Sequence, residues 1–232
     1  MSLFKPTTLT CPACRADVPF DAVHSINADR RPDLRQAILA ETFQQQACPN
    51  CRTVFRLDPQ FNFMDLENHQ WINAAPLAAL GDWKAQEATA QGLFDEVYGE
   101  QAPDAAREIG ASLNRRVTFG WAALREKLLA AANGLDDVTL ELCKSAVLRS
   151  GTPAPVSAAT ELRLIAVEGD ELVFGWLLAA DESLGPVLRV SRALYDQIAL
   201  DADGDWEDLR AEIDAGLFVD LNRLLIAGAP AA

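Results

Sequence analysis

Two short motifs bring together the residues of this chain that are best suited to chemistry. Each is a Cys-x-x-Cys pair with a proline directly after its first cysteine, and the four cysteines are Cys11, Cys14, Cys48 and Cys51. Two such pairs supply four thiolates at the spacing of a tetrahedral Zn²⁺ site, with metal–sulfur bonds of about 2.3 Å. Because four protein ligands leave no open position for a substrate, the motifs predict a structural zinc site.

A redox role for the two pairs is the alternative interpretation. A thioredoxin-type motif places its first cysteine at the N-terminus of a helix, and the residues after Cys14 do not begin a convincing helix. Pro12 and Pro49 fix φ near −65°, which suits the tight turn of a metal knuckle. We expect a cytoplasmic protein, since the first residues contain no apolar leader, and in a reducing compartment such pairs favour metal over disulfides.

The elements that must position the cysteines are short. Strands are expected at residues 7–10 and 18–24, on either side of the first pair, and at 53–57 after the second pair. A helix is expected from Pro32 to about Gln46, with Leu34 and Ile38 spaced four residues apart on one face. The metal site would therefore close a strand–helix–strand unit.

Helical periodicity dominates the middle of the chain. Apolar residues recur at helical spacing over 77–98 and again over 120–150, where Asn133-Gly134 marks a break. Asp136 and Asp137 follow that break. Adjacent residues on a helix do not face the same way, so this pair is interpreted as a helix N-terminus and not as an acid–base dyad.

The last third begins with the Gly/Pro-rich stretch 151–155, which has the composition of a linker. Two strand patterns at 162–168 and 171–179 then flank a two-residue turn and predict a hairpin, and helices are expected at 192–200 and 205–215. The fold class is α+β. We expect a zinc-ribbon-like module with an inserted helix at 1–72, followed by a larger acidic α+β region at 73–232 that is open to subdivision near 151–157.

Charge is distributed unevenly along the chain. The formal net charge is −14, yet residues 1–70 carry seven Lys/Arg against eight Asp/Glu. The excess of acid therefore lies downstream, where its field repels nucleic-acid phosphates. Arg15 and Arg52, next to the cysteines, would offset the negative charge of a zinc–thiolate centre. Alternatively, they belong to a phosphate-binding surface together with Arg30, Arg31, Arg35 and Arg56. No apolar run approaches the roughly 20 residues that span a bilayer.

Three other residues of the chain have imidazole or thiol side chains, which can bind metal or act as nucleophiles. His24 and His69 could replace or orient a ligand, but four cysteines already complete the site, so both are expected to be ordinary histidines. Cys143 stands between Leu140 and Val147 at helical spacing. It is expected to be a buried, inert thiol.

An Asp-rich segment near the C-terminus partly matches a calcium-binding loop. Four acids occupy the first, third, fifth and twelfth positions of an EF-hand pattern: Asp201, Asp203, Asp205 and Glu212. The sixth position requires a sharp turn that glycine permits, and here it is Trp206. The segment is therefore interpreted as an Asp-rich turn in which Asp205 caps a helix.

With its two Cys-Pro-x-Cys knuckles the chain resembles the bacterial CpXC-motif proteins, which are named for them. The resemblance extends to the inserted helix and, more weakly, to Leu-Arg-Glu-Lys-Leu at 124–128 and Gly-Leu-Asp-Asp at 134–137, with Glu141 and Lys144 after it. It implies a zinc-ribbon-like module in proteins of no established activity, with the four cysteines as metal ligands. The chain departs from the usual ribbon where Arg15 and Arg52 replace the glycine that often follows a knuckle.

No sequence motif indicates an enzyme. The chain contains no glycine-rich phosphate loop, no G-x-S-x-G elbow and no H-E-x-x-H helix. The sequence favours a zinc-stabilised, non-enzymatic adaptor or scaffold that binds another protein. Two alternatives stay open: nucleic-acid binding through the zinc ribbon, and an enzyme whose site lies unrecognised in the C-terminal region. The sequence specifies neither the partner, the pathway nor the oligomeric state.

Overall fold

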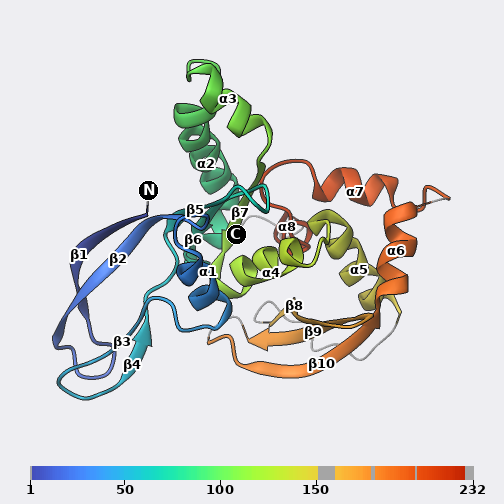
Figure 1. Cartoon of the computed structure of the whole chain (residues 1–232). Coiled ribbons are helices and arrows are strands. Elements are labelled where there is room, and N and C mark those ends of the chain that lie inside the picture. The colour runs from blue at the N-terminus through green and yellow to red at the C-terminus, as the bar shows by residue number, and fades with distance from the viewer. Residues whose placement is uncertain (1, 151–159, 179–180, 202, 228–232) are drawn as a thin grey trace. The chain divides into compact units, whose positions relative to one another are not determined.

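The computed structural model describes residues 2–150, 160–178, 181–201 and 203–227. The chain forms two compact units, Met1–Trp121 and Ala122–Ala232, and Figure 1 shows the elements of each. Helices and strands are both abundant, which confirms the α+β class. Among the described residues, none of the helices has the length and hydrophobicity that crossing a bilayer requires.

A mixed five-stranded sheet organises the first unit. Its order is β1 (Leu3–Thr10), β2 (Asp17–Asn27), β5 (Phe61–Asp65), β6 (Gln70–Ala75) and β7 (Asn114–Phe119). The pairs β1/β2 and β5/β6 are antiparallel, whereas β2/β5 and β6/β7 are parallel. A separate two-stranded sheet joins β3 (Gln45–Ala47) to β4 (Val54–Arg56). The two antiparallel hairpins β1/β2 and β3/β4 each carry one cysteine pair between their strands.

Four helical segments complete the first unit: α1 (Pro32–Leu39), the 3₁₀ segment η1 (Leu77–Asp82), α2 (Trp83–Tyr98) and α3 (Asp104–Ala111). Helix α1 buries Leu34 and Ile38, as their spacing predicted, but ends well before Gln46. Glu41 and Gln44 adopt φ of 62° and 57°, in the left-handed region where a right-handed helix cannot continue. The chain then enters β3.

An aromatic cluster fixes the segment that leads to the second cysteine pair. The buried ring of Phe43 lies edge-on to Phe61 of β5 and to Trp121, with ring centroids 6.2 and 6.0 Å apart. Arg56 of β4 stacks on the same Trp121 ring, with its guanidinium carbon 3.9 Å from the ring centroid. Residues on both sides of β3 are thus held against the core, which orients the β3–β4 hairpin.

The second unit packs helices against a three-stranded antiparallel sheet. The sheet order is β10 (Leu184–Ser191), β9 (Glu171–Leu178) and β8 (Thr160–Glu168), and the helices are α4 (Gly120–Ala132), α5 (Asp137–Arg149), α6 (Arg192–Leu200), α7 (Glu207–Ile213) and α8 (Asn222–Ala227). Leu140 and Cys143 of α5 share one buried cluster with Leu164 and Phe174 of the sheet.

Most sequence-based expectations for this part agree with the structure. The break at Asn133-Gly134 separates α4 from α5, and the β8–β9 hairpin turns at Gly169, whose φ is 60°. Asp136 caps α5 by accepting a hydrogen bond from the Thr139 N–H. Strand β10 was not predicted.

The compact units do not divide where the sequence placed a boundary. The position 72/73 lies inside β6, which pairs with β5 on one side and β7 on the other, so a division there would cut the first sheet. The units divide after Trp121 instead. The second expected boundary, near 151–157, lies outside the described residues.

Candidate metal centre

The four predicted ligands come together at the ends of the two hairpins of the first unit. Cys11 Sγ lies 3.7 Å from Cys51 Sγ, and Cys14 Sγ lies 3.6 Å from Cys48 Sγ. All four sulfur atoms lie within 4.8 Å of one another. Tetrahedral coordination with bonds of about 2.3 Å requires sulfur–sulfur separations of about 3.8 Å. The donor set therefore fits one metal ion, and all five cysteines of the chain are free thiols.

The two knuckles have the same main-chain geometry. The Cys11 N–H donates to Ala16 O at 2.9 Å, and the Arg15 N–H donates back to Cys11 O at 3.0 Å. The second knuckle repeats this exchange around Cys48, with distances of 2.9 and 2.8 Å. Arg15 and Arg52 occupy equivalent positions with φ of 60° and 64°. The backbone after each knuckle therefore has the left-handed conformation that glycine usually adopts there, although the residue is arginine.

The surroundings of the thiols are unequal. Cys11 and Cys48 are buried, whereas Cys51 is exposed. The Asn50 amide donates to Cys14 Sγ at 3.5 Å and lowers the pKa of that thiol to about 6. The Thr53 hydroxyl, 3.3 Å from Cys51 Sγ, lowers the pKa of Cys51. Hydrogen bonds to these two sulfurs thus favour the thiolate form, which is the form that binds metal.

Replacing Arg52 with glycine tests the strain at this knuckle. A left-handed backbone costs a residue with a Cβ about 1–2 kcal/mol in the folded state. Glycine avoids this strain, but its greater conformational freedom in the unfolded chain cancels part of the gain in stability. Arg52→Gly is expected to raise the free energy of unfolding of the metal-bound first unit by up to about 1 kcal/mol. Arg52→Ala is the control, because it removes the same charge and keeps the strain. Equal stability of the two variants in thermal unfolding would contradict this account.

The other residues considered from the sequence lie outside the cysteine cluster. His24 is exposed on β2, and His69 is exposed in the turn between β5 and β6. Cys143 is fully buried in the second unit, where burial raises the pKa of its thiol to about 12. In the described part of the chain, the four cysteines are the group whose ligand atoms converge closely enough to hold a metal.

The Asp-rich segment differs in detail from its prediction. Asp201 ends α6 with φ of 41°, and its carboxylate accepts a hydrogen bond from the Trp206 N–H at 3.2 Å. Trp206 occupies the N-cap position of α7, so the expected cap by Asp205 was wrong. The side chain that binds the start of α7 is therefore Asp201.

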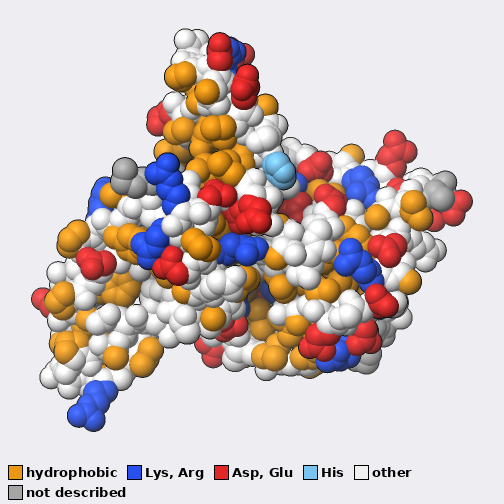
Figure 2. Space-filling model, in the orientation of Figure 1, with side chains coloured by type: hydrophobic (Ala, Val, Ile, Leu, Met, Phe, Trp, Pro, Cys, Tyr) orange, Lys and Arg blue, Asp and Glu red, His pale blue; other side chains and the backbone are white. Residues whose placement is uncertain are grey.

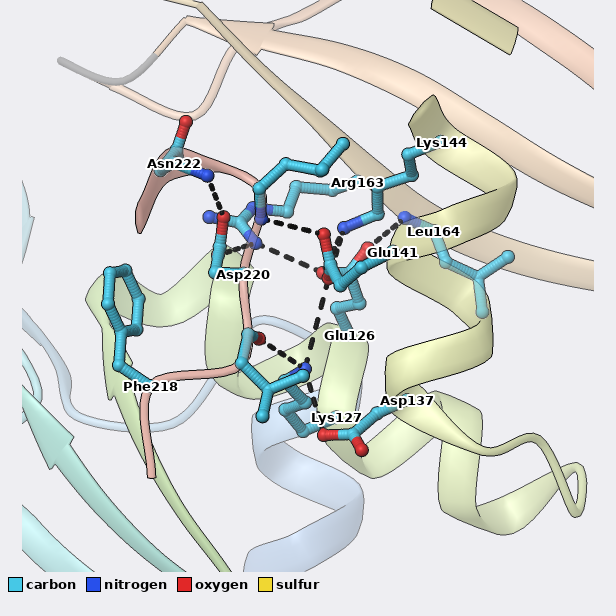
Figure 3. Close-up of polar contacts among 12 residues, drawn as sticks. Glu126, Lys127, Asp137, Glu141, Lys144, Arg163, Leu164, Phe218, Asp220 and Asn222 are labelled. Carbon is cyan, nitrogen blue, oxygen red and sulfur yellow. Dashed lines mark hydrogen bonds and ion pairs between the residues drawn. The ribbon is translucent and has the colours of Figure 1, made fainter. Parts of the chain in front are cut away.

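The second unit contains a concentration of buried charge that sequence reasoning missed (Figure 3). Eight ionisable residues, none more than 8 % exposed, come from α4, α5, β8 and the segment before α8: Glu126, Lys127, Asp137, Glu141, Lys144, Glu161, Arg163 and Asp220. Five of them are acids and three are bases. Because an isolated buried charge is costly, such groups persist only when they are paired.

Lys144 and Arg163 are the centres of this network. Lys144 Nζ lies 2.7 Å from Glu126 and 2.8 Å from Glu141. Arg163 Nη1 lies 3.0 Å from Glu126 and 2.5 Å from Asp220. Burial acts to raise the pKa of Glu126, but Lys144 and Arg163 outweigh it and hold that pKa below its ordinary value. Burial raises the pKa of Glu141 to about 7 despite the contact with Lys144.

The same carboxylates and one lysine bind the main chain. Glu126 accepts the Leu164 N–H of β8 at 2.6 Å, and Glu141 accepts the Leu221 N–H at 3.0 Å. Lys127 donates to the Val219 carbonyl at 2.7 Å. The network therefore joins α4 and α5 to the sheet and to the C-terminal segment. Its groups are enclosed and bonded to each other, which indicates a structural role.

Comparison with known families gives a single result. The model of the CpXC protein family matches residues 9–144, more than half of the chain. The chain belongs to the CpXC family. The match includes all four cysteines of the metal centre and the part of the buried network that α4 and α5 supply, ending at Lys144. No curated protein and no solved structure matches this CpXC protein.

Proposed function

We propose that this CpXC protein is a zinc-stabilised, non-enzymatic adaptor or scaffold of the cytoplasm that binds another protein. The metal centre supports the first part, because four thiols from one chain fill a tetrahedral site and leave no position for a substrate. Zinc is the metal that four such ligands favour in a site of this geometry.

The observation that carries the adaptor proposal is the exposure of strands in the metal-binding module. Most residues of β1 are exposed, on both faces of the strand, and among the described residues β1 has a strand neighbour on one side only, β2. Within the same part of the chain, β3 pairs only with β4. Unpaired strand edges present main-chain donors and acceptors to any extended segment that approaches. The hairpins held by the metal are therefore suited to binding a polypeptide.

Three of the six arginines in residues 1–72 make contacts within the fold. Arg31 pairs with Asp33 at 2.7 Å, Arg35 lies 3.3 Å from the buried Asp65, and Arg56 stacks on Trp121. On the face shown in Figure 2, the Lys and Arg side chains are scattered among acidic ones and form no continuous basic area. A basic face is the feature that nucleic-acid binding would require, so this alternative is the weaker one.

Affinity capture with the full chain tests the proposal. Metal-loaded protein, immobilised and exposed to lysate of its native host, is expected to retain a defined protein that metal-stripped protein does not retain. The matched test is a gel shift at 150 mM salt, where we expect no complex with DNA or RNA. The nucleic-acid alternative would be favoured if the protein shifts DNA or RNA and Arg52→Ala weakens that shift. The adaptor proposal would be rejected if, in addition, the capture experiment yields no metal-dependent protein partner.

A further inference from the structure

The metal-binding module contains a cleft that the metal centre does not use. This open cleft has a volume of about 350 Å³, which is within the size range of ligand pockets. It is lined by residues 6 and 7 of β1, 19–21 of β2, and 44–46, of which 45 and 46 belong to β3. Phe20 is nearly buried, and Asp21 is the one charged residue of the lining. The cleft belongs wholly to the first unit.

Two strand edges without a strand partner border this cleft. Strand β2 pairs with β1 along one edge, from Asp17 to Ser25. On its other edge β5 pairs only with Ser25–Asn27, so the stretch that lines the cleft has no strand beside it among the described residues. In the described part of the chain, β3 pairs with β4 alone. Neither stretch therefore has a second strand beside it.

The side chain of Gln44 already behaves as an added strand would. Its Oε1 accepts the Val23 N–H at 3.0 Å, and its Nε2 donates to the Asp21 carbonyl at 3.1 Å. This amide reproduces the donor–acceptor pair of one peptide group on the free edge of β2. Gln44 is also one of the few non-glycine residues with a left-handed backbone, a strain that functional sites often store.

Several polar side chains that line the cleft can form hydrogen bonds with a ligand. Within the described residues, the side chains of Thr7, Asp21 and Gln46 make no hydrogen bond, although all three line the cleft. The Gln46 amide offers a donor and an acceptor, which matches a peptide group. The Asp21 carboxylate attracts a cation, and the exposed Pro19 ring provides apolar contact.

We propose that this cleft binds an extended peptide segment of a partner protein, which adds to the free strand edges and places a Lys or Arg side chain against Asp21. The inference rests on the adaptor proposal, since it assumes a protein partner. Main-chain hydrogen bonds supply affinity in this mode, and the side-chain pocket supplies specificity. A charge-assisted contact with Asp21 gives the preference for a basic residue.

The metal centre supports this cleft from both sides. Cys11 directly follows β1, whereas Cys48 directly follows β3, so the two strands that line the cleft end at the same cysteine cluster. Loss of the metal would release these strands from one another. Peptide binding is therefore expected to depend on the metal.

A random heptapeptide display library, selected on the metal-loaded full chain, tests the inference without a known partner. We expect enriched peptides to combine β-branched or aromatic residues with a central Lys or Arg. For the synthetic peptides, Asp21→Asn should weaken binding about fivefold to tenfold, as the loss of one charge-assisted contact implies. Asp17→Asn is the matched control, because Asp17 is exposed on the same strand outside the cleft and should leave the affinity unchanged.

The outcomes separate the two proposals. Enriched peptides whose binding is insensitive to both Asp21→Asn and Gln46→Ala would overturn the cleft and leave the adaptor proposal standing. Enriched peptides without a basic residue would overturn the assignment of Asp21. A selection that enriches no peptide would overturn the cleft proposal, while the lysate capture decides the adaptor proposal by itself. The metal content of each variant, measured in parallel, shows that the module is intact.

Discussion

Replacing Lys144 with methionine is expected to destabilise the second unit by about 3–5 kcal/mol. The substitution removes the cation that lies within 2.8 Å of both Glu126 and Glu141, two carboxylates with no exposed surface. Methionine fills a volume similar to that of lysine, so the loss of stability reports the removal of the charge and not the creation of a cavity. With Lys144 gone, the five acids of the network face only Lys127 and Arg163.

The stability of the second unit is best measured by hydrogen exchange at the amides of α4 and α5. A chain of two compact units need not unfold in one transition, so a global unfolding curve would not isolate this unit. Lys84→Met is the matched control: Lys84 is an exposed helical lysine, and its loss should cost about 0.5 kcal/mol or less. Adding Glu126→Gln and Glu141→Gln to Lys144→Met should restore part of the lost protection. Unchanged exchange in Lys144→Met would show that the network does not hold the unit together.

The metal centre could be predicted from the sequence because its geometry is local. Each Cys-Pro-x-Cys pair closes its own turn through main-chain hydrogen bonds within six residues, as between Cys11 and Ala16. The only long-range requirement of the site is therefore that these two locally formed turns lie next to each other in the fold. The same reasoning found α4, α5 and the β8–β9 hairpin, where caps and turn residues lie next to the segments that they delimit.

The buried network could not be found in this way, because its partners are far apart in the sequence. The contact between Lys144 and Glu141 spans three residues and is visible in a helical pattern. The pairs of Arg163 with Glu126 and with Asp220 span 37 and 57 residues. Charged residues at such positions look like a solvated helix face until the tertiary fold encloses them.

The first sheet was missed for a related reason. Strands β6 and β7 pair in parallel although α2 and α3 lie between them in the chain, and β2 and β5 pair in parallel across α1 and the second knuckle. Parallel pairing requires such long connections. No turn signal next to the strands therefore reveals it, and the compact unit that contains this sheet runs to Trp121.

Purified protein is expected to contain one zinc ion per chain, and Cys48→Ser is expected to lose it. Cys48 is buried and lies 3.6 Å from Cys14, so its replacement removes one of the four converging sulfur donors. Binding free energy at such a site is folding free energy, of the order of 10–16 kcal/mol in small zinc-dependent domains. Chelation or Cys48→Ser should therefore increase hydrogen exchange in β1 to β4 while α5 stays protected.

Cys143→Ser is the matched control for this experiment, since it replaces a buried thiol of the second unit in the same chemical way. It should keep the full zinc content and lose some stability, because it places a hydroxyl in an apolar core. Loss of zinc in Cys143→Ser would show that the ligand set is wrong. Reduced protein that contains no metal, with Cys11–Cys14 and Cys48–Cys51 disulfides, would favour the redox alternative. Because the metal joins the β1/β2 hairpin to the β3/β4 hairpin, the same zinc-depleted protein should also fail to bind the selected peptides.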